Sequence, residues 1–262
     1  GYMIISTWNV NSIKVRIHAV LQYLSEYSPD VLALQETKTL DENFPLSDIE
    51  ALGYHISFLG QKTYNGVAII SKLKPESIDY NPVNTPFNEA RSIAVTIKGI
   101  TIVNLYVVNG QDVGTDKFKH KMLWFKNLHK YAKSLLSKTK KVILLGDFNI
   151  APTDNDVFDV DKTKNQILCS SDERGVLSKL LELGFHDVFH DFSYPPKTFT
   201  WWDYRAGAFH RNIGYRIDLI LLSNALKSKC TDYLIDKETR HKSWCLVEPR
   251  TSDHAPVRII LK

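Results

Sequence analysis

Residues 142–150 read Val-Ile-Leu-Leu-Gly-Asp-Phe-Asn-Ile, and this stretch indicates the fold most clearly. Val142 to Leu145 form an apolar run of strand length, and two polar side chains, Asp147 and Asn149, follow directly. Other apolar runs in the chain also end in Asn, Asp or Glu. Acids and amides at the same ends of packed strands can converge on one point. The pattern therefore predicts a rigid polar site on a sheet scaffold.

Further strands are predicted from short, β-branched apolar runs bounded by Gly, Pro, Asn or Asp. They cover residues 3–8, 31–34, 66–71, 93–97, 101–107, 217–222 and 255–261. Many strands with few scattered helices do not fit a regular βαβ repeat. We therefore expect an α/β fold of mixed α+β order, in which two packed mixed β-sheets are flanked by helices in a four-layer sandwich.

Two helices are predicted from apolar residues at spacings of three and four. The first has Ser12 as its expected N-cap, Pro29 just past its end, and an apolar face of Ile13, Ile17, Val20, Leu21 and Leu24. The apolar face of the second consists of Phe118, Met122, Phe125, Leu128, Ala132 and Leu135. Residues 154–171 and 194–216 are polar or aromatic without periodicity, so we expect surface loops that contact substrate.

Length and composition favour one globular unit. A chain of 262 residues with 44% hydrophobic residues is within the reach of a single core, so we expect one domain over residues 1–262. No apolar run is long enough to span a bilayer, and no leader precedes the first strand, which favours the cytoplasm and no membrane contact. The formal net charge of +4 permits a nucleic-acid partner without requiring one.

The number and spacing of the cysteines bear on disulfide bonds and zinc binding. Cys169, Cys230 and Cys245 are odd in number and form no CxxC pair, which argues against a disulfide framework and a thiolate zinc site. We expect them to be packing residues.

Six strand ends carry candidate site residues, and each has a simpler interpretation when taken alone. An Asp or Asn at a strand end is commonly a turn residue, and a single histidine is often structural. Together, the hard oxygen ligands Glu36, Asp253 and Asn11 suit Mg²⁺, while the absence of paired His or Cys ligands disfavours zinc.

In their order along the chain, these motifs resemble those of the endonuclease/exonuclease/phosphatase superfamily. The matching segments are residues 6–11, 34–38, 66–69, 146–149, 216–218 and 252–256. Residues 35–38 and 199–205 resemble the exonuclease III branch in particular. The resemblance implies a DNA-repair nuclease that cuts duplex DNA at abasic sites, cleans blocked 3′ ends and degrades DNA from 3′ to 5′.

The resemblance also implies a role for each site residue. Glu36 would bind Mg²⁺, with Mn²⁺ able to substitute, and Asn11 and Asp253 would lie near the ion. Asp147 would orient or deprotonate the attacking water and would be held by Asn149. The remaining implied groups are the pair Asp218 and His254 at the scissile phosphate, and the polar lining of Tyr106, Asn109 and Asn9.

The family also places aromatic and apolar residues around a flipped-out abasic sugar, which here would be Trp201, Tyr215 and Ile217. The alternative is that Trp201 and Trp202 are core or rim aromatics. Candidate phosphate contacts are Lys38, Arg91, Arg205, Arg211 and Arg216, although Arg216 has a structural alternative beside Asp218.

A basic face accompanies the second helix, because Lys119, Lys126, Lys130 and Lys133 lie opposite its apolar stripe. A solvated helix face is the ordinary interpretation, and a DNA track is the alternative.

Other substrates and roles remain open at this point. Double-stranded DNA with abasic sites or 3′ ends is the expected partner of a monomeric protein. Phosphatases of inositol lipids and sphingomyelin-cleaving enzymes share the metal and histidine chemistry, and a non-catalytic DNA-binding relative is a second alternative. Two residues depart from the family pattern, since Ser12 replaces a frequent Gly and Val108 a frequent Pro, which affects loop geometry rather than chemistry.

Overall fold

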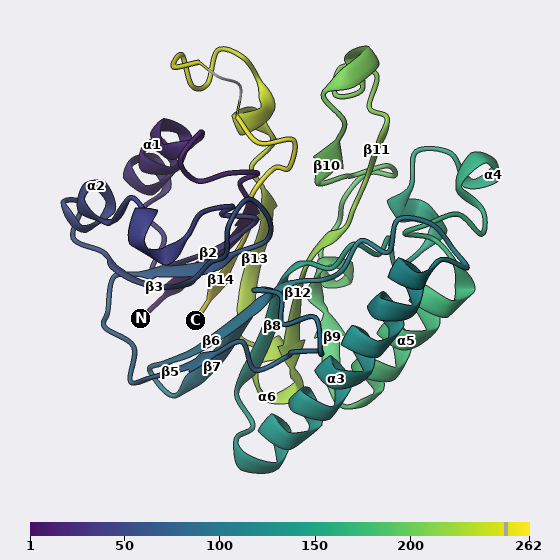
Figure 1. Cartoon of the computed structure of the whole chain (residues 1–262), viewed down its shortest axis with the longest axis horizontal. Coiled ribbons are helices and arrows are strands. Elements are labelled where there is room, and N and C mark those ends of the chain that lie inside the picture. Colours follow the sequence, from purple (N-terminus) through teal and green to yellow (C-terminus); the bar gives the residue numbers. More distant parts are fainter. Residues whose placement is uncertain (249–250) are drawn as a thin grey trace.

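The computed structural model describes residues 1–248 and 251–262, and two six-stranded mixed sheets form its centre (Figure 1). The strands of the first sheet, in spatial order, are β13 (Cys230–Ile235), β14 (Val257–Leu261), β1 (Met3–Asn9), β2 (Val31–Gln35), β4 (Val67–Ser71) and β3 (His55–Leu59). Those of the second are β5 (Ser77–Tyr80), β6 (Ser92–Ile97), β7 (Ile100–Tyr106), β8 (Val142–Asp147), β12 (Asp218–Ser223) and β9 (Phe185–Asp187). Each sheet has one parallel pair, β1 with β2 and β7 with β8.

Helices cover the outer faces of both sheets (Figure 1). The first sheet is covered by α1 (Ile17–Tyr27) and α2 (Leu46–Glu50), and the second by α3 (Asp116–Lys138) and α5 (Ser171–Glu182). Two short helices are α4 (Val160–Thr163) and α6 (Asn224–Lys227). The layers therefore follow the order helix, sheet, sheet, helix, which confirms the predicted four-layer sandwich.

The main core lies between the two sheets. Ile5 and Ala33 of the first sheet share one buried cluster with Ile143 and Ile220 of the second. Apolar side chains from both inner faces are thus removed from water together, which is the main favourable contribution to folding.

A buried polar network also joins the sheets. Asn104 of β7 donates to the backbone oxygens of Leu34 and Ala68 at 2.9 and 2.8 Å, across the sheet interface. Gln35 donates to Asn104 Oδ1 at 2.7 Å and to Thr7 Oγ1 at 2.9 Å. Because buried amides need partners of defined geometry, this network fixes how the sheets sit against each other beneath their polar ends.

All eight predicted strands are confirmed, with ends that shift by one or two residues. The predicted N-cap of the first helix is wrong. The helix begins at Ile17 after Arg16, while Ser12 Oγ accepts from the backbone nitrogen of Val15 at 3.3 Å and so caps an earlier turn.

The two segments expected to be surface loops contain regular structure. Residues 154–171 include a short 3-10 helix and α4, and residues 194–216 include β10 (Trp201–Trp202) and β11 (Gly214–Tyr215). These two strands pair and carry residues 201–215 outward as an arm, which we call the β10–β11 arm (Figure 1). Within the described ranges, no helix is long and apolar enough to cross a membrane.

Candidate active site

Strand register places three site residues beside one another. Asp147, the last residue of β8, pairs with Asp218 in antiparallel β12 and with Tyr106 in parallel β7. Asn9 ends β1 opposite Gln35 of β2. The polar residues that follow the strands therefore meet at one edge of both sheets.

Gly146 makes the approach of β7 to β8 possible. Its φ is +139°, and a Cβ atom at this position would lie 2.0 Å from the backbone oxygen of Leu105. No other residue fits without displacing β7. The glycine before Asp147 thus sets the position of that carboxylate.

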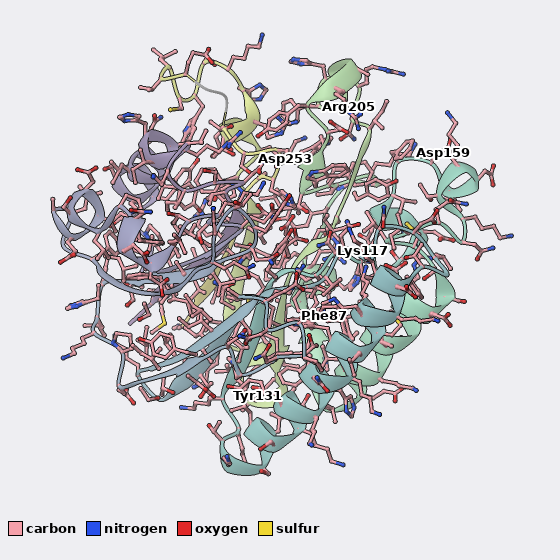
Figure 2. All side chains as sticks on the ribbon, viewed as in Figure 1. Phe87, Lys117, Tyr131, Asp159, Arg205 and Asp253 are labelled. Carbon is pink, nitrogen blue, oxygen red and sulfur yellow. The ribbon has the colours of Figure 1, made fainter. Side chains whose placement is uncertain are left out.

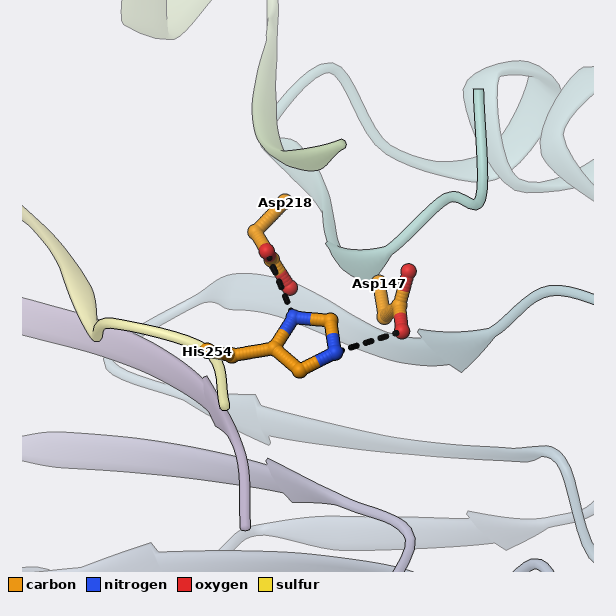
Figure 3. A group of neighbouring side chains, drawn as sticks. All are labelled: Asp147, Asp218 and His254. Atoms are coloured by element: carbon orange, nitrogen blue, oxygen red, sulfur yellow. Dashed lines mark hydrogen bonds and ion pairs between the residues drawn. The ribbon is translucent and has the colours of Figure 1, made fainter. Parts of the chain in front are cut away.

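Asp147, His254 and Asp218 form a buried line (Figure 3). His254 Nδ1 lies 2.8 Å from Asp218 Oδ2, and its Nε2 lies 3.6 Å from Asp147 Oδ2. Thr200 Oγ1 donates to the same Asp218 oxygen at 2.7 Å. Asp218 therefore holds the imidazole in one orientation, with Nε2 directed at Asp147.

Burial and charge shift the pKa of both ends of this line. Burial raises the pKa of Asp147 to about 7, with the His254 charge opposing the shift. Burial lowers the pKa of His254, but the Asp218 and Asp147 carboxylates outweigh that effect and raise the pKa to about 10. At neutral pH, His254 is therefore positively charged, and Asp147 is able to exchange a proton.

Asn9 connects Asp147 to a second carboxylate. Its Nδ2 donates to Glu36 Oε1 at 2.8 Å and to Asp147 Oδ2 at 3.0 Å. Glu36 has a φ of +53° and Lys38 a φ of +55°, a backbone conformation that is uncommon for residues other than glycine. Such strain concentrates at functional sites, where the surrounding structure maintains it.

Asn149 completes the loop after β8. Its backbone nitrogen donates to Asp147 Oδ1 at 3.0 Å, and its amide donates to the backbone oxygen of Val107 at 2.8 Å. Asn109 Nδ2 donates to Asn149 Oδ1 at 3.3 Å. Of the predicted polar lining, Asn9 and Asn109 are therefore connected through Asp147 and Asn149, and Tyr106 lines the same pocket.

A pocket of about 140 Å³ opens at this edge of the sheets. Its lining consists of Glu36, Tyr106, Asn109, Asp147, Asn149, Leu168, Trp201, Ile217, Asp253 and His254. Tyr215 is outside the lining and packs behind Trp201, with ring centroids 5.8 Å apart. Trp201 Nε1 donates to Asp253 Oδ2 at 2.9 Å, so the apolar wall and an acidic group are directly linked.

The donor set suits a divalent cation. Asp147, Asp218 and His254 bring potential ligand atoms within 4.8 Å of one another, and Asp218 Oδ1 is buried without a hydrogen-bond partner among the described residues. Because a protonated His254 has no free lone pair, the donors of this group at neutral pH are the carboxylate oxygens. The Glu36 and Asp253 carboxylates line the same pocket. Oxygen donors of this kind match hard ions such as Mg²⁺.

Asn11, a predicted metal ligand, does not line the pocket with Glu36 and Asp253. Its side-chain oxygen accepts from Lys38 Nζ at 2.7 Å. Its neighbour Ser12 has a φ of +85°, so the serine occupies a conformation that favours the glycine frequent in the family. Val108, the second departure, is a buried core residue.

The candidate phosphate contacts divide into buried and exposed groups. Arg216 is 0% exposed and bridges Asp156 and Asp187 at 2.7 and 2.6 Å, so of its two interpretations the structural one is confirmed. Arg91 is 8% exposed and lies outside the pocket lining, with its guanidinium carbon 4.8 Å from the centre of the Tyr106 ring.

Arg205 lies at the outer end of the β10–β11 arm (Figure 2), where its side chain is 87% exposed. Arg211 on the same arm is exposed as well, and Lys38 is partly exposed. The four lysines on the solvent side of α3 are also exposed, in agreement with the solvated-face interpretation.

Sequence reasoning missed Thr200, Leu168, Lys121 and Glu173. Thr200 stands inside the motif of residues 199–205, but nothing in the sequence shows its bond to Asp218. Lys121 falls on the apolar face of α3, four residues before Phe125, and a charge on that face was the available signal.

Comparison with known proteins agrees with this geometry. Residues 6–254 match the model of the Endonuclease/Exonuclease/phosphatase family, and the chain belongs to that family. Exodeoxyribonuclease III of Haemophilus influenzae is 32% identical over 264 residues, covering 96% of this chain and 97% of its own. Within the family, the chain is a DNA-repair nuclease of the exonuclease III and AP endonuclease group, and so a phosphodiester hydrolase.

Two solved structures are similar over nearly their whole length. A 3′ phosphatase from Neisseria bound to product DNA hairpin has a TM-score of 0.92 and 39% identity, with 99% of each chain covered. An AP endonuclease from Archaeoglobus fulgidus has a TM-score of 0.91 and 36% identity, again with 99% of each chain covered.

Proposed function

We propose that this protein hydrolyses DNA phosphodiesters with Mg²⁺, cutting at abasic sites, removing 3′-blocking groups and degrading duplex DNA from 3′ to 5′. The observation that carries the proposal is the line of Asp147, His254 and Asp218 at a pocket with an apolar wall. In this proposal, Asp147 as the base, His254 as a fixed cation and an apolar wall for the sugar lie next to one another.

Asp147 is proposed to take the proton of the attacking water. A general base works best when its pKa is near the working pH, and burial raises the pKa of Asp147 to about 7. Asn9 and Asn149 hold its two oxygens at 3.0 Å each and so aim the carboxylate. Tyr106 and Asn109 are proposed to line the site as further polar groups around the phosphate.

His254 is proposed to face the phosphate as a charged imidazolium. Negative charge builds on the phosphate oxygens during attack, and a fixed positive group stabilises that charge without reorganisation. Asp218 keeps the imidazole protonated and oriented through the 2.8 Å contact. Its role is therefore to position His254.

Glu36 and Asp253 would hold Mg²⁺ or Mn²⁺. Asn11 is proposed as a third ligand, which requires its side-chain oxygen to exchange its bond from Lys38 for the ion. When bound, the ion supplies positive charge against the charge that develops on the phosphate and the leaving 3′ oxygen. Asn9 orients Glu36, and Trp201 orients Asp253.

Trp201, Ile217 and, behind them, Tyr215 are proposed to receive the sugar of a flipped abasic nucleotide. An apolar wall accepts deoxyribose that lacks a base and rejects an intact nucleoside by its bulk. The relatives described as an AP endonuclease and a DNA-bound 3′ phosphatase are in line with this substrate class. We further propose that residues 1–262 act as one domain, as a monomer, in the cytoplasm.

A substrate panel tests the proposed function. The protein is incubated with Mg²⁺ and a duplex that carries one abasic site, the same duplex without the lesion, a duplex with a 3′-phosphate, an inositol phosphate and sphingomyelin. We expect incision at the lesion and loss of the 3′-phosphate, without turnover of the lipid-type substrates. Turnover of inositol phosphate or sphingomyelin, with all three duplexes left unchanged, would refute the proposal.

A further inference from the structure

A buried ion pair lies directly behind the site, between α3 and α5. Lys121 of α3 and Glu173 of α5 are each 0% exposed at their side chains, and Lys121 Nζ lies 2.5 Å from Glu173 Oε2. Removing two charges from water is costly, and a hydrophobic pair of similar volume is often as stable. Stability of the core therefore gives little reason for a charged pair here.

The contacts of Lys121 point toward the site. Its ammonium also donates to two backbone oxygens, that of Asn109 at 3.0 Å and that of Asn149 at 2.6 Å. The side chains of Asn109 and Asn149 both line the pocket and hydrogen-bond to each other. One cation thus holds the loop after β7 and the loop after β8 at a fixed separation.

Glu173 extends the same arrangement to a third loop. Its Oε2 also accepts from the backbone nitrogen of Leu168 at 3.0 Å, and its Oε1 accepts from Ser170. Leu168 lines the pocket with a φ of +77°, a strained conformation that needs support from its surroundings. The carboxylate supplies a bond to the strained residue itself.

We infer that Lys121 and Glu173 are positioning residues, which set the relative placement of the Asn109, Asn149 and Leu168 loops for catalysis. An apolar pair could fill the same volume but could not bond two carbonyl oxygens and a backbone nitrogen at once. The inference rests on the proposed nuclease function only for its effect on rate.

The test replaces the pair by neutral residues of similar shape, Lys121→Met with Glu173→Gln, so that no unpaired charge remains buried. The matched control is Arg258→Met with Asp236→Asn, which removes an ion pair of 2.9 Å whose residues are absent from the pocket lining. Thermal unfolding, DNA affinity without Mg²⁺ and the single-turnover cleavage rate of an abasic duplex are measured for both.

We expect the Lys121/Glu173 variant to lose about 10- to 100-fold in single-turnover rate, because small misplacements of catalytic groups cost this much. Its DNA Kd should stay within about threefold of wild type, and the control should retain the wild-type rate. A folded Lys121/Glu173 variant with the wild-type rate would overturn the inference. If that variant does not fold, Glu173→Asp keeps the charge but shortens the reach, and an unchanged rate in it would have the same meaning.

Hydrogen exchange separates this inference from the proposed function. Exchange at residues 108–111, 148–151 and 167–170 should be faster in the Lys121/Glu173 variant than in wild type, and unchanged in the control. Unaltered exchange in all three loops would overturn the positioning role even if the protein cleaves DNA. Faster exchange in the Lys121/Glu173 variant, combined with a wild type that cuts no DNA, would support the positioning role and refute the nuclease proposal.

Discussion

His254 must carry a positive charge if it is to stabilise a phosphate, and its two neighbours determine whether it does. In an apolar site, burial would make the imidazole neutral, but Asp218 at 2.8 Å and Asp147 at 3.6 Å reverse that tendency and raise its pKa to about 10. The same burial raises the pKa of Asp147 to about 7. Near neutral pH, Asp147 can thus act as a base while His254, paired with Asp218, carries a positive charge.

The role of Asp147 is tested by Asp147→Asn, which keeps the shape but removes the charge and most of the basicity. General-base assistance is worth about 10²- to 10⁴-fold, so kcat should fall by about that factor. DNA affinity should hold, since an anion near phosphate is removed. The measurement is single-turnover cleavage, so that product release does not mask the chemistry. Wild-type turnover in this variant would exclude Asp147 as the base.

Trp201 lines the pocket and also donates to Asp253, and two substitutions separate these contributions. Trp201→Phe keeps a ring but loses the N–H group, and we expect similar losses of about 10-fold on abasic and 3′-phosphate substrates, as for other groups that orient metal ligands. Trp201→Ala should lose further on the abasic substrate alone. The matched control is Trp244→Phe, which breaks a comparable 2.9 Å bond to Glu26. If Trp201→Phe and Trp201→Ala each lose the same factor in rate on the abasic and the 3′-phosphate substrates, the Trp201 ring does not help to seat the abasic sugar.

At the scale of elements, the predictable strands are the inner ones. The runs around Ile5, Leu32 and Leu144 are buried on both faces, so their apolar side chains are visible in the sequence. The missed strands β13, β3, β5 and β9 are the edges of the two sheets. Edge strands face solvent on one side, as β5 shows with exposed residues at all four positions, and they carry a weaker apolar signal.

Some site residues could be found from the sequence, while their partners could not. Asp147, Asp218 and His254 each end or precede an apolar run, so local pattern and family resemblance identified them. Glu173 and Lys121 are 52 residues apart, and only the packing of α5 on α3 brings them together. A contact between residues so far apart in the sequence produces no local pattern from which it could be predicted.

The base of the β10–β11 arm is supported by Arg216, which bridges Asp156 and Asp187. Burial opposes ionisation of Asp187, but the Arg216 charge, helped by a hydrogen bond from His190, outweighs burial and lowers the pKa of Asp187 to about 2 from an ordinary 3.8. A carboxylate whose pKa is depressed by folding stabilises the fold above its unfolded pKa. This contribution is lost as pH falls through the folded pKa.

Asp187→Asn should therefore lower the free energy of unfolding by roughly 2 kcal/mol at pH 7. The difference from wild type should shrink as pH falls from about 4 toward 2. Urea unfolding across this pH range measures it, with Asp191→Asn as an exposed control on the neighbouring turn. A difference that is as large at pH 2 as at pH 7 would assign the effect to shape rather than charge.

At the scale of the molecule, two sheets bring the ends of strands from the whole chain to a single edge. Asn9, Glu36, Asp147, Asp218 and His254 come from segments up to 245 residues apart in the numbering, yet they form one hydrogen-bonded and charged network. The Asn104 and Gln35 bonds fix one sheet on the other beneath it. Rigid support of this kind is what a preorganised site requires.

Incubation of the wild-type protein with a duplex carrying one abasic site, with Mg²⁺ or with excess EDTA, tests the central claim most directly. Hydrolysis expels the 3′ oxygen, so the account predicts a nick at the lesion with a 3′-hydroxyl end, seen on a sequencing gel as a product that a polymerase extends. Excess EDTA should abolish the nick, and Mg²⁺ or Mn²⁺ should restore it. Full incision in EDTA, or a 3′ end that still carries a sugar fragment, would contradict metal-dependent hydrolysis at this site.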